Sequence, residues 1–258
     1  MSKVLLEDAG EGIRVIRLAD PARRNAIDRV MRDELAAAVA KVAGDNTARV
    51  AVLRADGQSF CSGADVVETF GGADGKTVET VRAELFRVYE AFLPIRDLEI
   101  PTIAAVRGAA IGAGLNMALC CDVRIAAPDA AFGAVFSRIG LHPGGGCSYM
   151  LSALMGPQHA LRVLLDGATL DANEALRRGL VDEVATDPDA AAMELARRWA
   201  ALDPELSRGI KHSVQLAERE GLAASLEYES WAQARSAQKP AIQRIVAQRR
   251  EKTASTRT

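Results

Sequence analysis

The chain has 258 residues, 49% of them hydrophobic and 26% charged, with a formal net charge of −2. This composition is typical of a globular protein with one large domain, or one domain and an appendage. The nearly balanced charge gives no basis for binding nucleic acid or an anionic membrane. The glycines and Arg107 interrupt the one long apolar stretch, so we expect no membrane partner.

The four cysteines form no CxxC pair, and two of them are adjacent in a helical pattern. Neighbouring helical side chains point in different directions, so this spacing suits neither a disulfide framework nor a zinc site. We therefore expect buried, reduced thiols, no metal and a cytoplasmic location. The cysteines are Cys61, Cys120, Cys121 and Cys147.

The first half of the chain alternates between strand and helix patterns. Two short strands flank Gly10 and Gly12, which predicts a hairpin. Asp28 is placed to cap the helix that follows. Another helix and two core strands come next. The expected strands are 4–8, 13–20, 49–55 and 102–108, and the expected helices are 31–43 and 79–97.

Beyond residue 108 the alternation continues, with glycine-rich loops between elements. We expect a helix from near Ala113, a strand region over 122–133, and a helix after the glycine turn at 142–146. This order predicts an α/β fold with right-handed crossovers. The pattern is helical to the end after about residue 185, so we expect a core over residues 1–195 and a helical region over 196–258.

The segment "RGAAIGAGLNMALCCD" (107–122) places small residues directly before an apolar helix. It fails the dinucleotide fingerprint G-x-G-x-x-G, because Met117 stands where the third glycine belongs. Small residues let main chain approach a ligand closely, and the first amides of a helix lack internal partners. "SGAD" (62–65) is a second glycine loop after a strand. If the two loops face each other, two amides converge on one oxygen and form an oxyanion hole. Two ordinary strand-to-helix turns are the alternative.

Four segments together resemble the crotonase, or enoyl-CoA hydratase/isomerase, superfamily. They are "RRNAID" (23–28), "FCSGAD" (60–65), "RGAAIGAGLNMALCCDVRIA" (107–126) and "AFGAVFSRIGLHPGGG" (131–146). The resemblance covers nearly the whole chain. It implies a β-β-α spiral core and a C-terminal helical trimerisation region, with trimers commonly stacked into hexamers. It also implies an acyl-CoA thioester as ligand. Coenzyme A would then be part of the substrate, and no cofactor would be bound permanently.

The resemblance assigns roles to particular residues. The backbone amides of Ala64 and Ala113 match the two oxyanion-hole donors, which hold the thioester oxygen as an enolate forms. Arg24 and Ala26 match positions that contact the phosphate and adenine end of coenzyme A. The remaining positions that the resemblance places on the ligand channel are Ser62, Asp65, Val66 and Val67.

The chain departs from the family pattern at two catalytic positions. Family hydratases carry two glutamates, one on the helix after the second oxyanion donor and one after the Phe-Gly turn. These positions are Asn116 and Phe136 here. Neither side chain exchanges a proton near neutral pH, and such transfers typically contribute about 10²–10⁴-fold to a rate. Asn116 is left with hydrogen bonding alone, and we expect Phe136 to close the acyl pocket with apolar surface.

His142, in "LHPGGG", is the most attractive replacement, because histidine changes charge near physiological pH. A histidine that only fixes the glycine turn through a backbone hydrogen bond is the alternative. Glu68 follows the "GAD" loop and could reach the pocket, but a solvated position is expected. The other polar candidates have expected surface or packing roles. They are Cys61, Ser137, Arg138, Ser148 and Tyr149.

Three functions fit these residues. The first is an enzyme that forms a thioester enolate with a non-standard acid or base, as an unusual hydratase, isomerase or lyase. The second is an acyl-CoA decarboxylase, because loss of CO₂ creates an enolate without a general base. The third is a non-catalytic acyl-CoA-binding protein, which the apolar Phe136 would suit. Fold alone does not decide among them.

Overall fold

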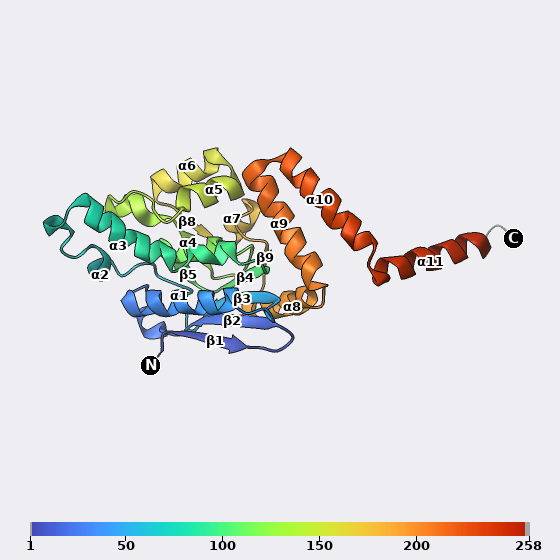
Figure 1. The fold of residues 1–258 in the computed structure, drawn as a ribbon. Helices are drawn as coiled ribbons and strands as arrows, with labels where there is room; N and C mark the ends of the chain where they lie inside the picture. Colours follow the sequence, from blue (N-terminus) through green and yellow to red (C-terminus); the bar gives the residue numbers. More distant parts are fainter. Residues whose placement is uncertain (1, 256–258) are drawn as a thin grey trace. The chain divides into compact units, whose positions relative to one another are not determined.

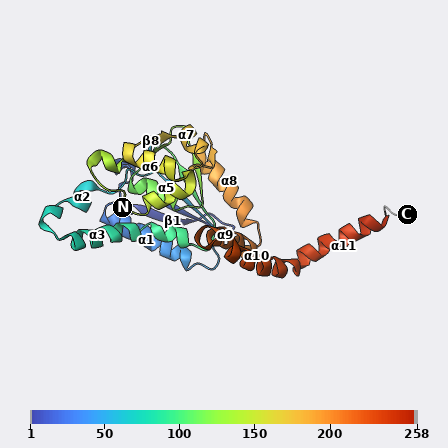
Figure 2. The ribbon, with the colours of Figure 1, turned by 90° about the horizontal axis from the view of Figure 1, so that it is seen from above.

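The computed structural model describes residues 2–255, and the chain falls into two compact units, Met1–Ala201 and Leu202–Thr258 (Figures 1 and 2). The expected boundary after residue 195 lies inside helix α8 (Pro188–Ala200). Ala192, Ala196 and Ala200 of this helix are buried against the sheet. The first unit therefore extends to Ala201, just past the end of α8 and beyond the expected boundary. Residues 256–258 of the expected C-terminal region lie outside the described residues.

The predicted hairpin forms the beginning of the main sheet. Strands β1 (Val4–Asp8) and β2 (Ile13–Leu18) pair antiparallel, and β2 then pairs parallel with β3 (Val50–Ala55). Helix α1 (Arg29–Ala43) connects β2 to β3, and Figure 1 shows it lying beside the first strands. As expected, Asp28 caps α1, since its Oδ1 accepts the Met31 amide at 2.9 Å.

The core repeats a strand–strand–helix unit. Strands β4 and β5 are followed by helix α4, and β6 and β7 are followed, after a single-turn helix, by α5. Because β4 pairs parallel with β6 and β5 with β7, each repeat adds one strand to each of two sheets. This is the expected β-β-α spiral. The bounds are β4 (Thr102–Val106), β5 (Ala109–Ile111), α4 (Ala113–Leu119), β6 (Val123–Ala126), β7 (Ala131–Gly133) and α5 (Cys147–Met155).

The larger sheet has the order β1-β2-β3-β4-β6-β9, and the smaller one has the order β5-β7-β8. Alternate side chains of the larger sheet face opposite ways, as the two-residue period of a strand requires. Ile13 and Val15 of β2 pack with α8, whereas Ile16 and Leu18 face the main core that includes α1 and α4. The closing strands are β8 (Thr169–Asp171) and β9 (Glu183–Val184).

Two α-helices lie between β3 and β4 in the chain, and both line the site described below. They are α2 (Val66–Phe70) and α3 (Val78–Glu90). The helix expected over 79–97 ends at Glu90, and a short 3₁₀ helix with Pro94 in its first turn covers Leu93–Asp97. Proline lacks the N–H that would continue an α-helix, which explains the change. The other helices of this unit are α6 (Pro157–Asp166) and α7 (Ala172–Arg177).

The second unit is helical, as its sequence predicts, and its described residues form three helices: α9 (Pro204–Glu220), α10 (Leu222–Ala237) and α11 (Pro240–Ser255). Asp203 caps α9, and Gly221 with φ of 81° separates α9 from α10. The two helices pack through the rings of His212 and Tyr228, whose centroids are 4.6 Å apart. No described helix in either unit is long and apolar enough to cross a membrane.

Candidate active site

The two glycine loops predicted to face each other do so. The Cys61 amide donates to Ala109 O at 2.9 Å, and the Ile111 amide donates to Cys61 O at 3.0 Å, which ties the "SGAD" loop to β5. Gly63 adopts φ of 99°, and a Cβ there would lie 2.8 Å from Ile111 O and 3.7 Å from Ala113 N. Gly63 thus lets the loop approach the start of α4 more closely than a residue with a side chain could.

The amides of Ala64 and Ala113 remain unused at this junction. Neither N–H has a hydrogen-bond acceptor within residues 2–255, although their neighbours do. The Asp65 amide donates to Ile27 O at 3.0 Å, and the Gly112 amide donates to Gly133 O at 2.9 Å. Two main-chain donors at one junction can stabilise negative charge on an oxygen between them.

The residues expected to contact coenzyme A lie beside the same loop. The Ser62 amide donates to Arg24 O at 3.0 Å, and the Ile27 amide donates to Gly63 O at 2.8 Å. The structure therefore brings segment 23–28, with Arg24 and Ala26, alongside "SGAD". The exposed Arg24 side chain has no partner among the described residues.

Asp65 stabilises this arrangement through its carboxylate. Its carboxylate caps α2 by accepting the Glu68 amide at 2.9 Å and pairs with Arg23. Of the two valines that follow, Val66 lines the cavity described next, whereas Val67 is 81% exposed and is not part of the lining.

A cavity of about 140 Å³ opens beside the two free amides. Its lining is mostly apolar, and no aspartate or glutamate is among the described residues that line it. The lining residues that matter below are Ser62, Ala64, Thr69, Val88, Tyr89, Ala113, Asn116, Phe136, His142 and Gly144. The cavity thus combines an apolar wall, two amide donors and five polar side chains, of which Tyr89, Asn116 and His142 are described below.

Asn116 is buried in the wall of this cavity, with an exposed fraction of 1%. Its Nδ2 donates to Gly144 O at 2.8 Å, which fixes the orientation of the amide because a carbonyl oxygen only accepts. Its Oδ1 has no partner within the described structure. An unsatisfied buried acceptor costs about 1–3 kcal/mol, so a ligand that donates to Oδ1 is favoured.

His142 is an exposed residue that lines the cavity. Its Nδ1 lies 2.8 Å from Pro143 O, so the ring does fix the glycine turn. Because that oxygen is an acceptor, Nδ1 carries the hydrogen, and Nε2 of the neutral ring keeps its lone pair. A His142 held in this tautomer can still accept a proton at Nε2.

Tyr89 is a site residue that the sequence did not indicate. Burial raises the pKa of its hydroxyl, although the Gly145 amide donates to the same oxygen. The phenol is therefore neutral at physiological pH, and its own proton is available to an acceptor in the cavity. Only glycine suits this turn, because a Cβ on Gly144 would overlap Tyr89 Oη and one on Gly145 would lie 2.8 Å from Asn116 Nδ2.

Phe136 lines the cavity as expected, and its ring atoms lie 3.9 Å from the position of a Cβ on Gly112. The buried Met117 belongs to the core behind it. Cys61 is fully buried, and burial raises its pKa to about 12, so the thiol is not a nucleophile at neutral pH. All four thiols are buried and free, as predicted.

The other polar candidates lie away from the cavity lining. Ser137 and Arg138 pack against Gly167, and Arg96 stacks on the Tyr149 ring with its guanidinium carbon 5.3 Å from the centroid. Glu68 lines a different cavity and pairs with Arg29. A metal ion has no obvious place, since no group of three or more His, Cys, Asp or Glu suited to one occurs within residues 2–255.

Comparison with known proteins places this geometry in context. The profile of the family described as enoyl-CoA hydratase/isomerase matches residues 8–255. A Mycobacterium tuberculosis protein named "Probable enoyl-CoA hydratase EchA14" is 45% identical over 194 residues, which cover 75% of this chain and 74% of that protein.

Two crystal structures share the fold over nearly their whole length. A Mycobacterium abscessus protein described as an enoyl-CoA hydratase/isomerase superposes with a TM-score of 0.86 and 33% identity, covering 95% of this chain and 96% of that chain. A Streptomyces coelicolor protein described as an enoyl-CoA hydratase gives a TM-score of 0.87 and 31% identity, covering 97% of this chain and 92% of that chain.

Proposed function

This chain belongs to the enoyl-CoA hydratase/isomerase family, the crotonases, and from that premise we propose that it adds water to an enoyl-CoA, or removes it from the product, without the two family glutamates. The observation that carries the proposal is the buried, unpartnered Oδ1 of Asn116, a residue that lines a cavity whose described lining has no carboxylate. Coenzyme A enters as part of the substrate, and no cofactor is held permanently.

In the proposed reaction the thioester oxygen accepts the Ala64 and Ala113 amides. A water molecule donates one hydrogen to Asn116 Oδ1 and the other to His142 Nε2, two acceptors that replace the two carboxylates. His142 takes a proton as the water oxygen bonds to the β-carbon, and the electron pair of the double bond forms the enolate. The imidazolium then returns the proton to the α-carbon, so the atoms of one water are added.

The runner-up reactions make weaker use of this cavity. An isomerase needs one proton carrier, which His142 alone supplies, but it leaves Asn116 Oδ1 without a donor. A decarboxylase needs a carboxylate held near Asn116 or His142, and the unpartnered Oδ1 and Nε2 of these two residues are acceptors, which leaves the Tyr89 hydroxyl to donate to the anion. A pure acyl-CoA binder has little need for two free amides at the thioester.

The direct test is mass spectrometry of CoA products from a mixed panel, with thermal shift in parallel. The panel holds short, long, branched and aromatic enoyl-CoAs, β,γ-enoyl-CoAs and malonyl-type CoAs. The expected product is heavier than its enoyl-CoA by one water and carries ¹⁸O when H₂¹⁸O is used. A shifted double bond or loss of CO₂ would establish a runner-up reaction, and stabilisation without any product would establish a binder.

Replacing His142 by glutamine is expected to lower kcat for hydration by about 10²-fold or more, because the lost base typically contributes that much. Stabilisation by acyl-CoA should persist, since the amide donors are untouched. His159→Gln is the matched control, as that histidine is exposed on α6 and lies outside the cavity lining. Equal kcat values for the His142→Gln and His159→Gln variants would show that His142 is not the base in this reaction.

We also propose that the second unit mediates self-association into trimers or hexamers. Helices α9 and α10 expose several large apolar side chains, which suits a surface covered by another copy. They include Leu206, Ile210, Val214, Leu226 and Trp231. Light scattering should give a mass three or six times that of the 27.4 kDa chain, and a monomer at micromolar concentration would contradict the proposal.

A further inference from the structure

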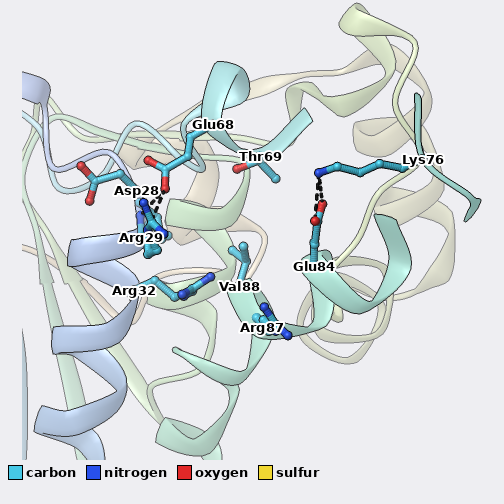
Figure 3. A pocket seen from close by; sticks show the side chains of 10 residues that line it. Asp28, Arg29, Arg32, Glu68, Thr69, Lys76, Glu84, Arg87 and Val88 are labelled. Atoms are coloured by element: carbon cyan, nitrogen blue, oxygen red, sulfur yellow. Dashed lines mark hydrogen bonds and ion pairs between the residues drawn. The ribbon is translucent and has the colours of Figure 1, made fainter. Parts of the chain in front are cut away.

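A second cavity, of about 270 Å³, lies between the start of α1, α2 and the middle of α3 (Figure 3). Its lining differs from that of the acyl cavity, because most of its side chains are charged. Four are cations, Arg29, Arg32, Lys76 and Arg87, and three are carboxylates, Asp28, Glu68 and Glu84.

The three carboxylates are already engaged. Asp28 caps α1 and pairs with Lys3 and Arg23, and Glu68 accepts the Arg29 amide at 3.1 Å. Glu84 pairs with Lys76 at 2.8 Å. Within the described residues, none of the three forms an ion pair with Arg32 or Arg87.

Arg32 and Arg87 keep unused donors in this cavity. Arg87 has no partner within the described residues. Arg32 contacts a single acceptor, Asp33 Oδ1, through Nε at 2.8 Å and Nη2 at 2.7 Å. Figure 3 shows Arg32 reaching from α1 toward Arg87 on α3, below Val88. Two guanidinium groups that line one cavity and keep unused donors can bind an anion.

The two cavities are neighbours. Thr69 of α2 and Val88 of α3 line both of them, so these two side chains form the partition. An acyl chain that begins at the Ala64 and Ala113 amides and passes this partition would end among the guanidinium groups. A methyl end would be poorly placed there, whereas a carboxylate would be paired.

We propose that the acyl group of the substrate carries a carboxylate at its far end, bound by Arg32 and Arg87. The inference rests on the proposed function, because it requires an acyl-CoA thioester in the first cavity. It adds the substrate class, a CoA thioester of a dicarboxylic acid. A phosphate of coenzyme A is also an anion that guanidinium groups bind, and the experiment below distinguishes a phosphate from an acyl carboxylate.

The test compares saturated acyl-CoAs of equal chain length that end in a carboxylate or in a methyl group, with binding measured by calorimetry. The natural chain should bind the carboxylated member about tenfold more tightly at the best length, as expected for one charge-assisted pair. Arg32→Gln and Arg87→Gln should each bring this ratio close to one and leave the affinity for the methyl-ended member unchanged. Arg82→Gln, an exposed α3 arginine outside this cavity that stacks on Phe86, should change neither affinity.

The other outcomes overturn the inference in distinguishable ways. If the natural chain bound both members with equal affinity at every length, acyl-CoA binding would stand, but the proposed preference for a carboxylate at the far end of the acyl group would be wrong. If Arg87→Gln weakened free coenzyme A and both acyl-CoAs equally, the cavity would be a phosphate site. If no acyl-CoA bound at all, the proposed function would fail and this inference with it.

Discussion

Replacing Ala113 by proline is expected to lower kcat/KM by about 10²–10³-fold, the usual cost of losing one oxyanion donor. Ala113 is the first residue of α4, and its N–H has no acceptor within the described structure. Proline is well tolerated at the first position of a helix, where the missing N–H makes no helical hydrogen bond. The substitution therefore deletes the donor, puts a ring carbon in its place and keeps the helix.

Two comparisons isolate this effect. Ala113→Gly keeps the N–H and should retain most of the activity, at a helix cost of about 1 kcal/mol or less. Thermal unfolding of both variants without ligand shows whether α4 has survived. A proline variant with undiminished kcat/KM and normal stability would mean that the thioester oxygen lies elsewhere.

The main sheet could be predicted because its signals are local. The apolar pattern of residues 4–8 and 13–18, the cap at Asp28 and the glycine loops each depend on a few neighbouring residues. The α/β class and the facing of the two loops followed from these signals and from the resemblance. The expected boundary near residue 196 falls inside α8, because α8 is helical like the second unit and only its buried alanines show that it packs on the sheet.

The candidate site was predictable only along segments that carry a recognisable pattern. The positions of Ala64, Ala113, Asn116 and His142 could be found because glycine loops surround them in the sequence. Tyr89 and Arg87 lie on a helix whose pattern resembles any solvated amphipathic helix, and their contacts come from turns and helices far along the chain. A sequence without aligned relatives gives no signal for such long-range packing.

The orientation of Asn116 also required the structure. The sequence indicates an amide where a carboxylate is expected, but not which of its two polar atoms is free. The contact of Nδ2 with Gly144 O decides this and leaves Oδ1 as a buried acceptor without a partner in the described structure. That one assignment favours hydration, which needs acceptors for water, over decarboxylation, which needs donors for an anion.

Arg124 gives the second large expected effect, on stability. This β6 residue is 5% exposed, and its guanidinium donates to Leu180 O at 2.5 Å and Cys121 O at 2.6 Å. Burial lowers the pKa of Arg124, with nearby Cys121 and Asp122 opposing the shift. The side chain therefore joins the chain segment just after α4 to the loop before β9. Both carbonyls belong to buried residues, so water cannot take the place of the guanidinium as their donor.

Arg124→Met is expected to lower the free energy of unfolding by about 3 kcal/mol or more, because it fills similar volume but leaves buried carbonyls without a donor. Urea unfolding should show a lower midpoint with an unchanged slope. Arg198→Met is the control, since that arginine is exposed and its pair with Glu194 spans 3.6 Å, so a change within about 0.5 kcal/mol is expected. Because α4 carries both Ala113 and Asn116, folded Arg124→Met protein should still bind acyl-CoA if the guanidinium only anchors the end of this helix.

Equal midpoints for the two variants would show that the carbonyls find other donors and that Arg124 is not needed to hold α4 in place.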